Sequence, residues 1–231
     1  MPINTSINLK VVKLVAEALG ELREEVLFVG GSVASLYAND PAASDPRPTK
    51  DIDVSVQVAS YAEMNKLSEL LAQKGFQPSP EFSVIYRRRF KDILVDFIPF
   101  EPTPLGPTNT WLKPGFEVSE WHDLEGTAIR ILPVSYFLAS KWEAFLARGK
   151  DDPLTSHDLE DFIYVMDYHL HIVQQISSSD NKVKPYLQKA VQYILDQSNR
   201  DAFIEAQLIP SIATDRRLMI VAKMEQILTE T

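Results

Sequence analysis

The chain has 231 residues, of which 45% are hydrophobic, enough to bury a core in one large or two small domains. It contains no cysteine, which excludes a disulfide framework, a thiolate zinc site and a cysteine nucleophile. Its formal charge of -9 argues against a protein that grips nucleic acid over its whole surface, because phosphate neutralisation needs a dense basic face. Neither a signal-peptide pattern nor an apolar run of roughly 18 residues is present, so we expect a cytoplasmic protein without membrane contact.

The first third of the chain predicts a helix, a short strand, a glycine turn and a loop. Apolar residues recur at helical spacing over 9–19, and Gly20 stands where a C-terminal cap belongs. The apolar run 26–29 predicts a strand that ends at the Gly-Gly-Ser turn 30–32, where a helix-compatible stretch begins. Three prolines and few apolar residues predict a surface loop over 39–49.

The next elements carry aspartates at regular positions. Strict alternation over 51–58 predicts a half-buried strand with two carboxylates, Asp51 and Asp53, on its polar face. Ser60 and Gly75 then bracket an amphipathic helix as its N-terminal and C-terminal caps.

Two further strands are predicted over 83–90 and 93–100 as antiparallel neighbours, and the second carries Asp96. Proline and glycine make 100–116 an expected irregular segment, and 127–132 predicts a last strand.

The character of the chain changes after this strand, because the remaining segments all read as helices. Their expected bounds are 133–147, 156–170, 182–197, 201–208 and 214–228. We therefore predict an α/β fold of the α+β kind, with a small mixed sheet in an N-terminal domain over 1–130 and an all-helical domain over 131–231.

Three polar features suit phosphate chemistry: the turn 30–32, the Asp51-x-Asp53 pair and Asp96. A glycine turn lets the backbone and the N–H groups of a helix start approach a phosphate closely. Two aspartates two residues apart on a strand share a face, and magnesium prefers carboxylate and phosphate oxygens. Two metal ions about 4 Å apart stabilise the attacking and leaving oxygens of an in-line displacement.

Asp96 strengthens this interpretation, because it stands among apolar residues where a carboxylate is costly unless something binds it. We expect a buried metal ligand. The alternative is an unrelated α/β protein in which the aspartates form a polar strand face.

A basic run, Arg87-Arg88-Arg89 with Lys91, lies in the same region. One interpretation is that it lines the path of an anionic substrate. The other is that these side chains solvate an exposed strand.

Three segments resemble the nucleotidyltransferase signature of the DNA polymerase β superfamily, namely Phe28-Val-Gly-Gly-Ser-Val-Ala, Thr49-Lys-Asp-Ile-Asp-Val and Val95-Asp-Phe. Three later segments resemble the nucleotidyltransferase toxins of abortive-infection, type IV toxin-antitoxin systems: Leu138-Ala-Ser-Lys-Trp-Glu-Ala-Phe145, Arg148-Gly-Lys-Asp151 and Ser156-His-Asp-Leu-Glu-Asp161. The resemblance covers about positions 26 to 170.

The resemblance implies roles for individual residues. Catalysis is assigned to Asp51, Asp53, Asp96 and Lys141. The two Mg²⁺ (or Mn²⁺) ions are assigned to Asp51, Asp53 and Asp96. Binding of ATP or another NTP is assigned to Gly30, Gly31, Ser32, Lys141, Asp158 and Asp161, the last two in the wall of the site. Lys141 is expected on a helix face outside the core, and the plain alternative for Asp158 is a first-turn acid behind Ser156 as N-cap.

The predicted function is transfer of a nucleoside monophosphate from an Mg-NTP to an acceptor hydroxyl, with release of pyrophosphate. By resemblance the acceptor is an RNA or tRNA 3′ end, a protein hydroxyl or a small molecule such as an aminoglycoside. The basic run favours RNA, while the charge of -9 restricts the contact to a short end. The resemblance also implies a toxin with an antitoxin partner. The other class of function is a nucleotide-binding or antitoxin-partner module without turnover.

Overall fold

The structure is a computed structural model that describes residues 7–78, 86–101 and 108–230. The chain divides into two compact units. The sheet unit comprises Met1–Val33 and Arg47–Pro133, and the helical unit comprises Ala34–Pro46 and Val134–Thr231. The sequence places the break after residue 130 and keeps 34–46 with the N-terminal part, whereas in the structure this segment packs with the helices.

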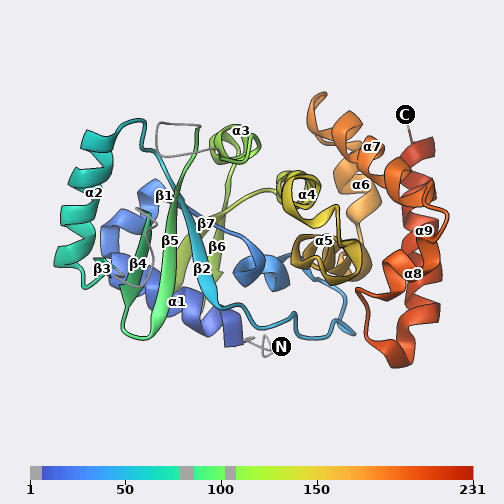
Figure 1. The fold of residues 1–231 in the computed structure, drawn as a ribbon, viewed down its shortest axis with the longest axis horizontal. Coiled ribbons are helices and arrows are strands. Elements are labelled where there is room, and N and C mark those ends of the chain that lie inside the picture. Colours follow the sequence, from blue (N-terminus) through green and yellow to red (C-terminus); the bar gives the residue numbers. More distant parts are fainter. Residues whose placement is uncertain (1–6, 79–85, 102–107, 231) are drawn as a thin grey trace. The chain divides into compact units, whose positions relative to one another are not determined.

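The described part of the sheet unit holds a seven-stranded mixed sheet in the order β3-β4-β5-β2-β1-β7-β6 (Figure 1). The pairs β2–β5 and β1–β7 are parallel, and the other neighbouring pairs are antiparallel. This mixed sheet, with its accompanying helices, confirms the expected α/β class. The strands are β1 (Val26–Val29), β2 (Asp51–Val56), β3 (Gln77–Pro78), β4 (Arg87–Phe90), β5 (Ile93–Pro99), β6 (Glu120–Leu124) and β7 (Thr127–Ile131).

The central strand β2 follows the predicted alternation. Ile52 and Val54 are buried, while Asp51 and Asp53 are half-buried on the other face. The neighbouring strands supply fully buried aromatic rings, Phe28 from β1 and Phe97 from β5. The apolar side chains of these three strands therefore form the core that holds the polar face of β2 in a fixed position.

The region between β3 and β7 is only partly as predicted. β4 and β5 pair antiparallel as expected, although residues 83–85 of the first predicted strand lie outside the described residues. A helix, α3 (Leu112–Glu117), lies within the segment that was expected to be irregular. The strand β6 was not predicted. Among the described strands it lies at the edge of the sheet and pairs with β7, and an edge strand needs little apolar content.

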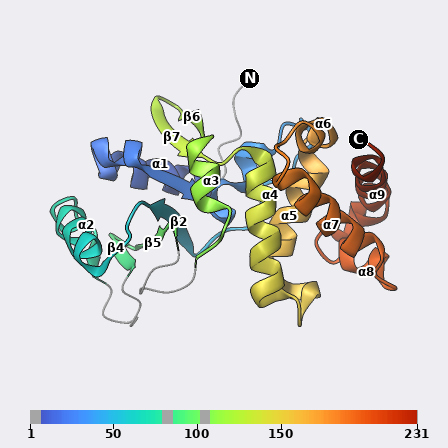
Figure 2. The ribbon, with the colours of Figure 1, turned by 90° about the horizontal axis from the view of Figure 1, so that it is seen from above.

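Two longer helices belong to the sheet unit (Figures 1 and 2). α1 (Ile7–Leu19) packs against β7, and α2 (Tyr61–Gln73) packs beside β3. The predicted caps are present: Gly20 has a φ of +58°, and the Ser60 side chain accepts a hydrogen bond from the Glu63 amide at 3.3 Å.

The described helical unit contains α4 (Val134–Ala144), α5 (His157–Tyr168), α6 (Ile172–Ser177), α7 (Val183–Leu195), α8 (Arg200–Glu205) and α9 (Ala213–Thr229). The five predicted helices correspond to α4, α5, α7, α8 and α9, and α6 was not predicted. An aromatic cluster joins them in the core, with Trp142 5.0 Å from Phe145 and 5.7 Å from Phe162 between ring centroids. After α4 the chain continues as a π-turn over Phe145–Gly149.

The proline-rich loop is fastened to the helical unit by hydrogen bonds. The Asn39 and Asp40 amides donate to the Tyr168 carbonyl at the end of α5, at 3.1 and 3.0 Å. The Tyr164 hydroxyl donates to the Ser44 carbonyl at 2.8 Å. These bonds satisfy backbone groups at the C-terminal end of α5, which explains why a segment of low apolar content packs with the helices.

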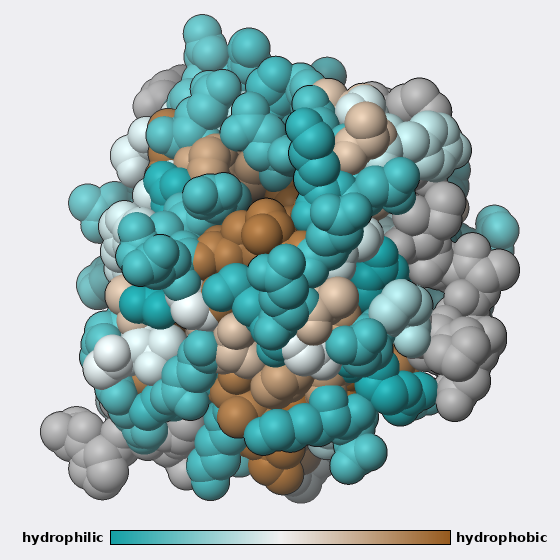
Figure 3. Space-filling model, turned by 90° about the vertical axis from the view of Figure 1, so that its left-hand side faces the viewer, coloured by the Kyte–Doolittle hydropathy of each residue, from teal (hydrophilic) through white to brown (hydrophobic). Residues whose placement is uncertain are grey.

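No helix in the described ranges is long and apolar enough to cross a membrane. Figure 3 shows the side of the molecule on which α2 lies in Figure 1, where apolar patches alternate with hydrophilic side chains. The large apolar residues of α2 that are exposed are Tyr61 and Leu70.

Candidate active site

Asp51, Asp53 and Asp96 form a group that we call the carboxylate cluster. The parallel pairing of β2 with β5 sets Asp53 directly opposite Asp96. Asp51 precedes Asp53 by two residues on β2, so the two side chains project from the same face of the sheet. The structure thus brings the three predicted carboxylates together on adjacent strands.

The glycine turn after β1 lies directly against this cluster. Gly30 has a φ of +76°, a conformation that favours glycine, and β1 pairs Val29 with Asp53. A Cβ atom on Gly30 would lie 2.1 Å from Oδ2 of Asp53. Because glycine has no Cβ atom, the Asp53 carboxylate can lie directly beside the backbone of the turn.

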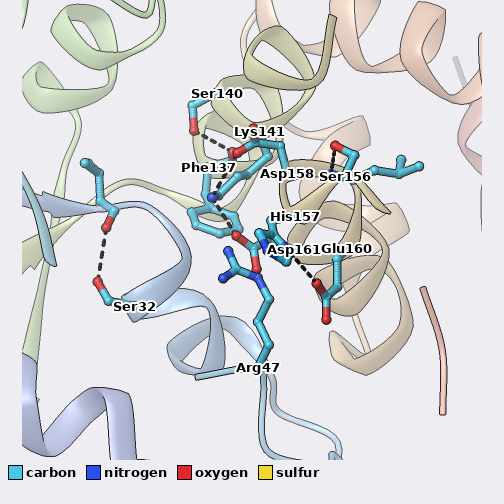
Figure 4. A network of polar contacts seen from close by, with 12 residues as sticks. Ser32, Arg47, Phe137, Ser140, Lys141, Ser156, His157, Asp158, Glu160 and Asp161 are labelled. Carbon is cyan, nitrogen blue, oxygen red and sulfur yellow. Dashed lines mark hydrogen bonds and ion pairs between the residues drawn. The ribbon is translucent and has the colours of Figure 1, made fainter. Parts of the chain in front are cut away.

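Ser32 follows in a 3-10 helix over Gly31–Tyr37, where the sequence predicted the start of a helix. Its side chain is buried, and its hydroxyl donates to the Val29 carbonyl at 3.4 Å (Figure 4). This hydrogen bond links the end of β1 to the first residues of the 3-10 helix and stabilises the turn between them. Phosphate binding by Gly30, Gly31 and Ser32 stays a prediction.

Arg87 also belongs to this site, although the sequence did not predict that it does. β4 pairs Arg87 opposite Asp96, and the guanidinium grips that carboxylate with two hydrogen bonds of 2.7 Å, from Nε to Oδ1 and from Nη2 to Oδ2. The same Nη2 donates to Oδ2 of Asp51 at 2.9 Å. One nitrogen is therefore held by two carboxylates of the cluster.

The charge state of Arg87 follows from these contacts. The hydrogen bond to Asp96 and the negative charges of all three aspartates outweigh burial and raise the pKa of the guanidinium above its usual value. Arg87 stays protonated, and an approaching cation meets a resident positive charge.

The neighbouring Arg88 points elsewhere. Its side chain is buried, donates to the Ser68 hydroxyl at 2.5 Å and to the Arg87 carbonyl at 2.9 Å, and burial lowers its pKa. The basic run therefore does not form one solvent-facing patch. The sequence contained a signal for this, because successive residues of a strand, such as Arg87 and Arg88, face opposite sides of the sheet.

The carboxylate cluster has suitable donor atoms for a metal ion, but its side chains are not arranged around a common metal position. The donor set suits Mg²⁺, and two of the carboxylates already converge on one positively charged nitrogen. Among the described residues, however, no three His, Asp or Glu side chains are arranged as ligands of one ion. Arg87 provides a physical reason, because it orients Asp51 and Asp96 toward itself. Binding of Mg²⁺ or Mn²⁺ stays a prediction.

The other predicted residues, Lys141, Asp158 and Asp161, meet in the helical unit (Figure 4). Together with Arg148, which lies 2.7 Å from Asp158, they form what we call the helical ion cluster. The Lys141 ammonium lies 2.6 Å from Asp161 and 3.4 Å from Asp158. Lys141 is 5% exposed, so the expectation that it lies outside the core is wrong. Its aspartate partners on α5 allow the charge to be buried.

Two local features position the helical ion cluster. The π-turn ends at Gly149, where a Cβ atom would lie 2.2 Å from the Ser156 hydroxyl, so glycine permits the close approach to α5. Ser156 is the predicted N-cap, accepting from the Leu159 amide at 3.4 Å. Asp158 in the first turn accepts two hydrogen bonds from Arg148, of 2.7 and 3.0 Å.

Burial opposes ionisation of Asp158. The hydrogen bonds from Arg148 and the charge of Lys141 outweigh burial, so the pKa of Asp158 lies below its usual value. Contact of Lys141, Asp158 and Asp161 with a nucleotide stays a prediction, and the geometry supplies a structural role for each.

No family model matches the chain, and no curated protein matches it as a relative. Two solved structures are similar to it. An antigenic nucleotidyltransferase-like protein from Paracoccidioides brasiliensis has 15% identity and a TM-score of 0.49, covering 83% of this chain and 90% of that one. The antibiotic-resistance factor ANT(2'')-Ia has 12% identity and a TM-score of 0.48, covering 84% of this chain and 97% of that one. A likeness at this level leaves the residues of the site to indicate the function.

Proposed function

We propose that this chain is a metal-dependent nucleotidyltransferase whose metal-binding side chains are Asp51, Asp53 and Asp96. The observation that supports the proposal is the convergence of Asp51 and Asp96 on one nitrogen of Arg87, with Asp53 in register beside them. Carboxylate oxygens around a point that already holds a positive charge are the donors that Mg²⁺ prefers. A turn that only glycine fits adjoins this point.

In the proposed reaction, the oxygen of an acceptor hydroxyl forms a bond to the α-phosphorus of an NTP. The bond from that phosphorus to the bridging oxygen of the β-phosphate breaks, and pyrophosphate leaves. Asp96, on β5, is proposed to accept the hydroxyl proton. Bound Mg²⁺ supplies charge neutralisation for the phosphate oxygens. The backbone of the glycine turn is proposed to bind the phosphates.

The proposed acceptor is an RNA or tRNA 3′ end, and the biological role that goes with it is a toxin neutralised by an antitoxin protein. The inward orientation of Arg87 and Arg88 removes part of the basic surface that favoured RNA. A cationic small molecule of the aminoglycoside type is therefore the alternative acceptor, since a chain of charge -9 attracts it.

A nucleotide-binding module without turnover is the second candidate function. The observation that favours it is that Arg87 engages two of the three carboxylates, which leaves fewer oxygens for a metal pair. The two candidates differ in one respect that is measured directly, because only an enzyme releases pyrophosphate.

The test is incubation of the full chain with each labelled NTP and Mg²⁺, with total RNA, total protein or an aminoglycoside as acceptor. We expect label on one acceptor and equimolar pyrophosphate, both abolished by Asp53→Asn. The matched control is Asp92→Asn, the same chemical change in the exposed turn between β4 and β5. Nucleotide binding without pyrophosphate under all conditions supports the non-catalytic module and contradicts the enzyme.

A further inference from the structure

Arg87 supplies the carboxylate cluster with a positive charge of its own. Its side chain is 19% exposed, and its partner Asp96 is 10% exposed. Because both Oδ atoms of Asp96 and one of Asp51 accept from the guanidinium, Arg87 uses oxygens that a metal ion needs. Charge-assisted, two-pronged contacts of this kind are among the strongest that side chains make.

A divalent ion and Arg87 have conflicting requirements at these oxygens. Magnesium binds carboxylate oxygens at about 2.0–2.1 Å, closer than a guanidinium nitrogen. Because Nη2 contacts both Asp96 and Asp51, a divalent ion held by these two carboxylates would lie close to the guanidinium, and the two positive charges would repel each other. Loss of a proton does not release Arg87, because a guanidinium keeps its charge at every physiological pH.

We propose that Arg87 is a displaceable internal cation, which holds Asp51 and Asp96 while no metal is bound and leaves them when a divalent ion enters. The proposal rests on the proposed function for the identity of the ion. It gives the site two arrangements, one closed by the guanidinium and one open to metal. Arg87 is thereby a positioning residue that sets the metal concentration at which the site assembles.

The free energy needed to move Arg87 away from the carboxylates lowers the affinity of the site for the metal ion. When the binding-competent arrangement is a small fraction of the population, the apparent dissociation constant rises by the inverse of that fraction. If roughly 1–10% of the molecules are open, removal of Arg87 tightens metal binding on the order of ten- to a hundredfold.

The direct test follows the Arg87 side chain by NMR in the full chain with ¹⁵N-labelled arginine. The Nε–H resonance of Arg87 is assigned by its loss in Arg87→Gln. We expect this resonance to shift or broaden as Mg²⁺ is added, while the resonance of Arg130 stays in place. Arg130 is a suitable reference, because it contacts the Glu24 carbonyl and the rings of Phe116 and Trp121.

The second test is calorimetric titration with MnCl₂ of the wild type, Arg87→Gln and the matched control Arg130→Gln, which removes the same charge from the same unit. We expect Arg87→Gln to bind Mn²⁺ at least tenfold more tightly than the wild type, and Arg130→Gln to bind it equally. Arg87→Lys keeps a charge without the two-pronged contact and serves if the glutamine variant does not fold. The affinity of Arg87→Lys for Mn²⁺ is expected to lie between those of the wild type and Arg87→Gln.

Unchanged or weaker Mn²⁺ binding in Arg87→Gln and Arg87→Lys overturns the proposal, as does an Arg87 resonance that is unaffected at saturating Mg²⁺. In those cases metal-dependent pyrophosphate release by the wild type leaves the proposed function intact. Absence of divalent-ion binding in every variant overturns the proposal and contradicts the proposed function as well. Tighter binding in the variants supports both.

Discussion

The sheet unit and the helical unit each hold a group of aspartates with basic partners, and the two groups differ in charge balance. The carboxylate cluster has three aspartates and Arg87, so these four groups sum to a formal charge of -3 + 1 = -2. The helical ion cluster has two aspartates with Lys141 and Arg148, which sum to -2 + 2 = 0. Within these named groups, an excess of negative charge suits a site that takes up a cation, whereas a balanced set suits a structural one.

The two groups also differ in exposure. The side chains of Asp51 and Arg87 are 34% and 19% exposed, whereas those of Asp161 and Lys141 are 2% and 7% exposed. Arg148, with 72% of its side chain exposed, is the exposed member of the helical ion cluster. Removing a partner from the buried group leaves a charge that water does not reach. Removing a carboxylate from the other group relieves repulsion among like charges. The comparison therefore predicts opposite balances of activity and stability for mutations in the two units.

The largest expected effect is on turnover in the carboxylate cluster. Asp53→Asn is expected to lower the rate of pyrophosphate release on the order of a thousandfold or more. The reason is that Asp53 is proposed to hold a metal ion, and such an ion supplies several kcal/mol of transition-state stabilisation. The melting temperature is expected to stay within a few degrees of the wild type. A variant with a much lower melting temperature and unchanged turnover would show that Asp53 has a structural role.

The next largest effect is on stability in the helical unit. Lys141→Met is expected to lower the free energy of unfolding by about 3–5 kcal/mol, because Asp158 and Asp161 lose a buried countercharge. Denaturant unfolding measures this change, and Lys189→Met on the exposed side of α7 is the matched control. An Lys141 variant as stable as the control, with weakened NTP binding, would return Lys141 to the nucleotide-contact role that the sequence assigns to it.

A smaller effect is expected in the glycine turn, where two variants distinguish steric contact with Asp53 from backbone strain at positive φ. Both Gly30→Ala and Gly126→Ala place a side chain at positive φ, which costs about 1 kcal/mol. Only at Gly30 does the new Cβ meet a carboxylate, that of Asp53, since Gly126 has open space around it. We expect Gly30→Ala alone to reduce turnover, by about tenfold or more. Equal activity in the two variants would contradict the placement of the turn against the cluster.

The smallest effect concerns acid. The folded-state pKa of Asp158 lies below its usual value, so its contribution to stability is present above about pH 4 and is lost as the pH falls through the folded pKa. Asp158→Asn is expected to show a shallower loss of stability than the wild type below about pH 4. Urea unfolding at several pH values between about 3 and 6 measures the two slopes. Identical slopes would mean that Asp158 does not gain stability from Arg148 and Lys141.

The strand pattern was sufficient to predict where the carboxylates lie. Alternation fixes which face Asp51 and Asp53 occupy, and apolar flanks mark the strand of Asp96 as buried. The parallel register of β2 with β5, which sets Asp53 opposite Asp96, was not predicted from the sequence. Glycine and serine caps likewise marked the ends of α1 and α2, because caps depend on local geometry.

What the sequence did not predict depends on pairing over long distances. Arg87 was assigned to a basic run, and only the register of β4 with β5 shows that it faces Asp96. Lys141 was expected outside the core, and its burial depends on two aspartates from a different helix. The strand β6 has a polar sequence, and its place at the edge of the sheet follows from its hairpin with β7.

The most direct test of the central proposal, that the surplus negative charge of the carboxylate cluster serves cation-dependent nucleotide binding, is calorimetric titration of the full chain with ATP and the other NTPs. We expect one NTP to bind in Mg²⁺ and not in EDTA, because triphosphate and carboxylates repel each other without a bridging cation. Asp53→Asn is expected to abolish the Mg²⁺-dependent binding, and Asp92→Asn to leave it unchanged. NTP binding of equal affinity in Mg²⁺ and EDTA, or binding that survives in Asp53→Asn, would contradict the proposal.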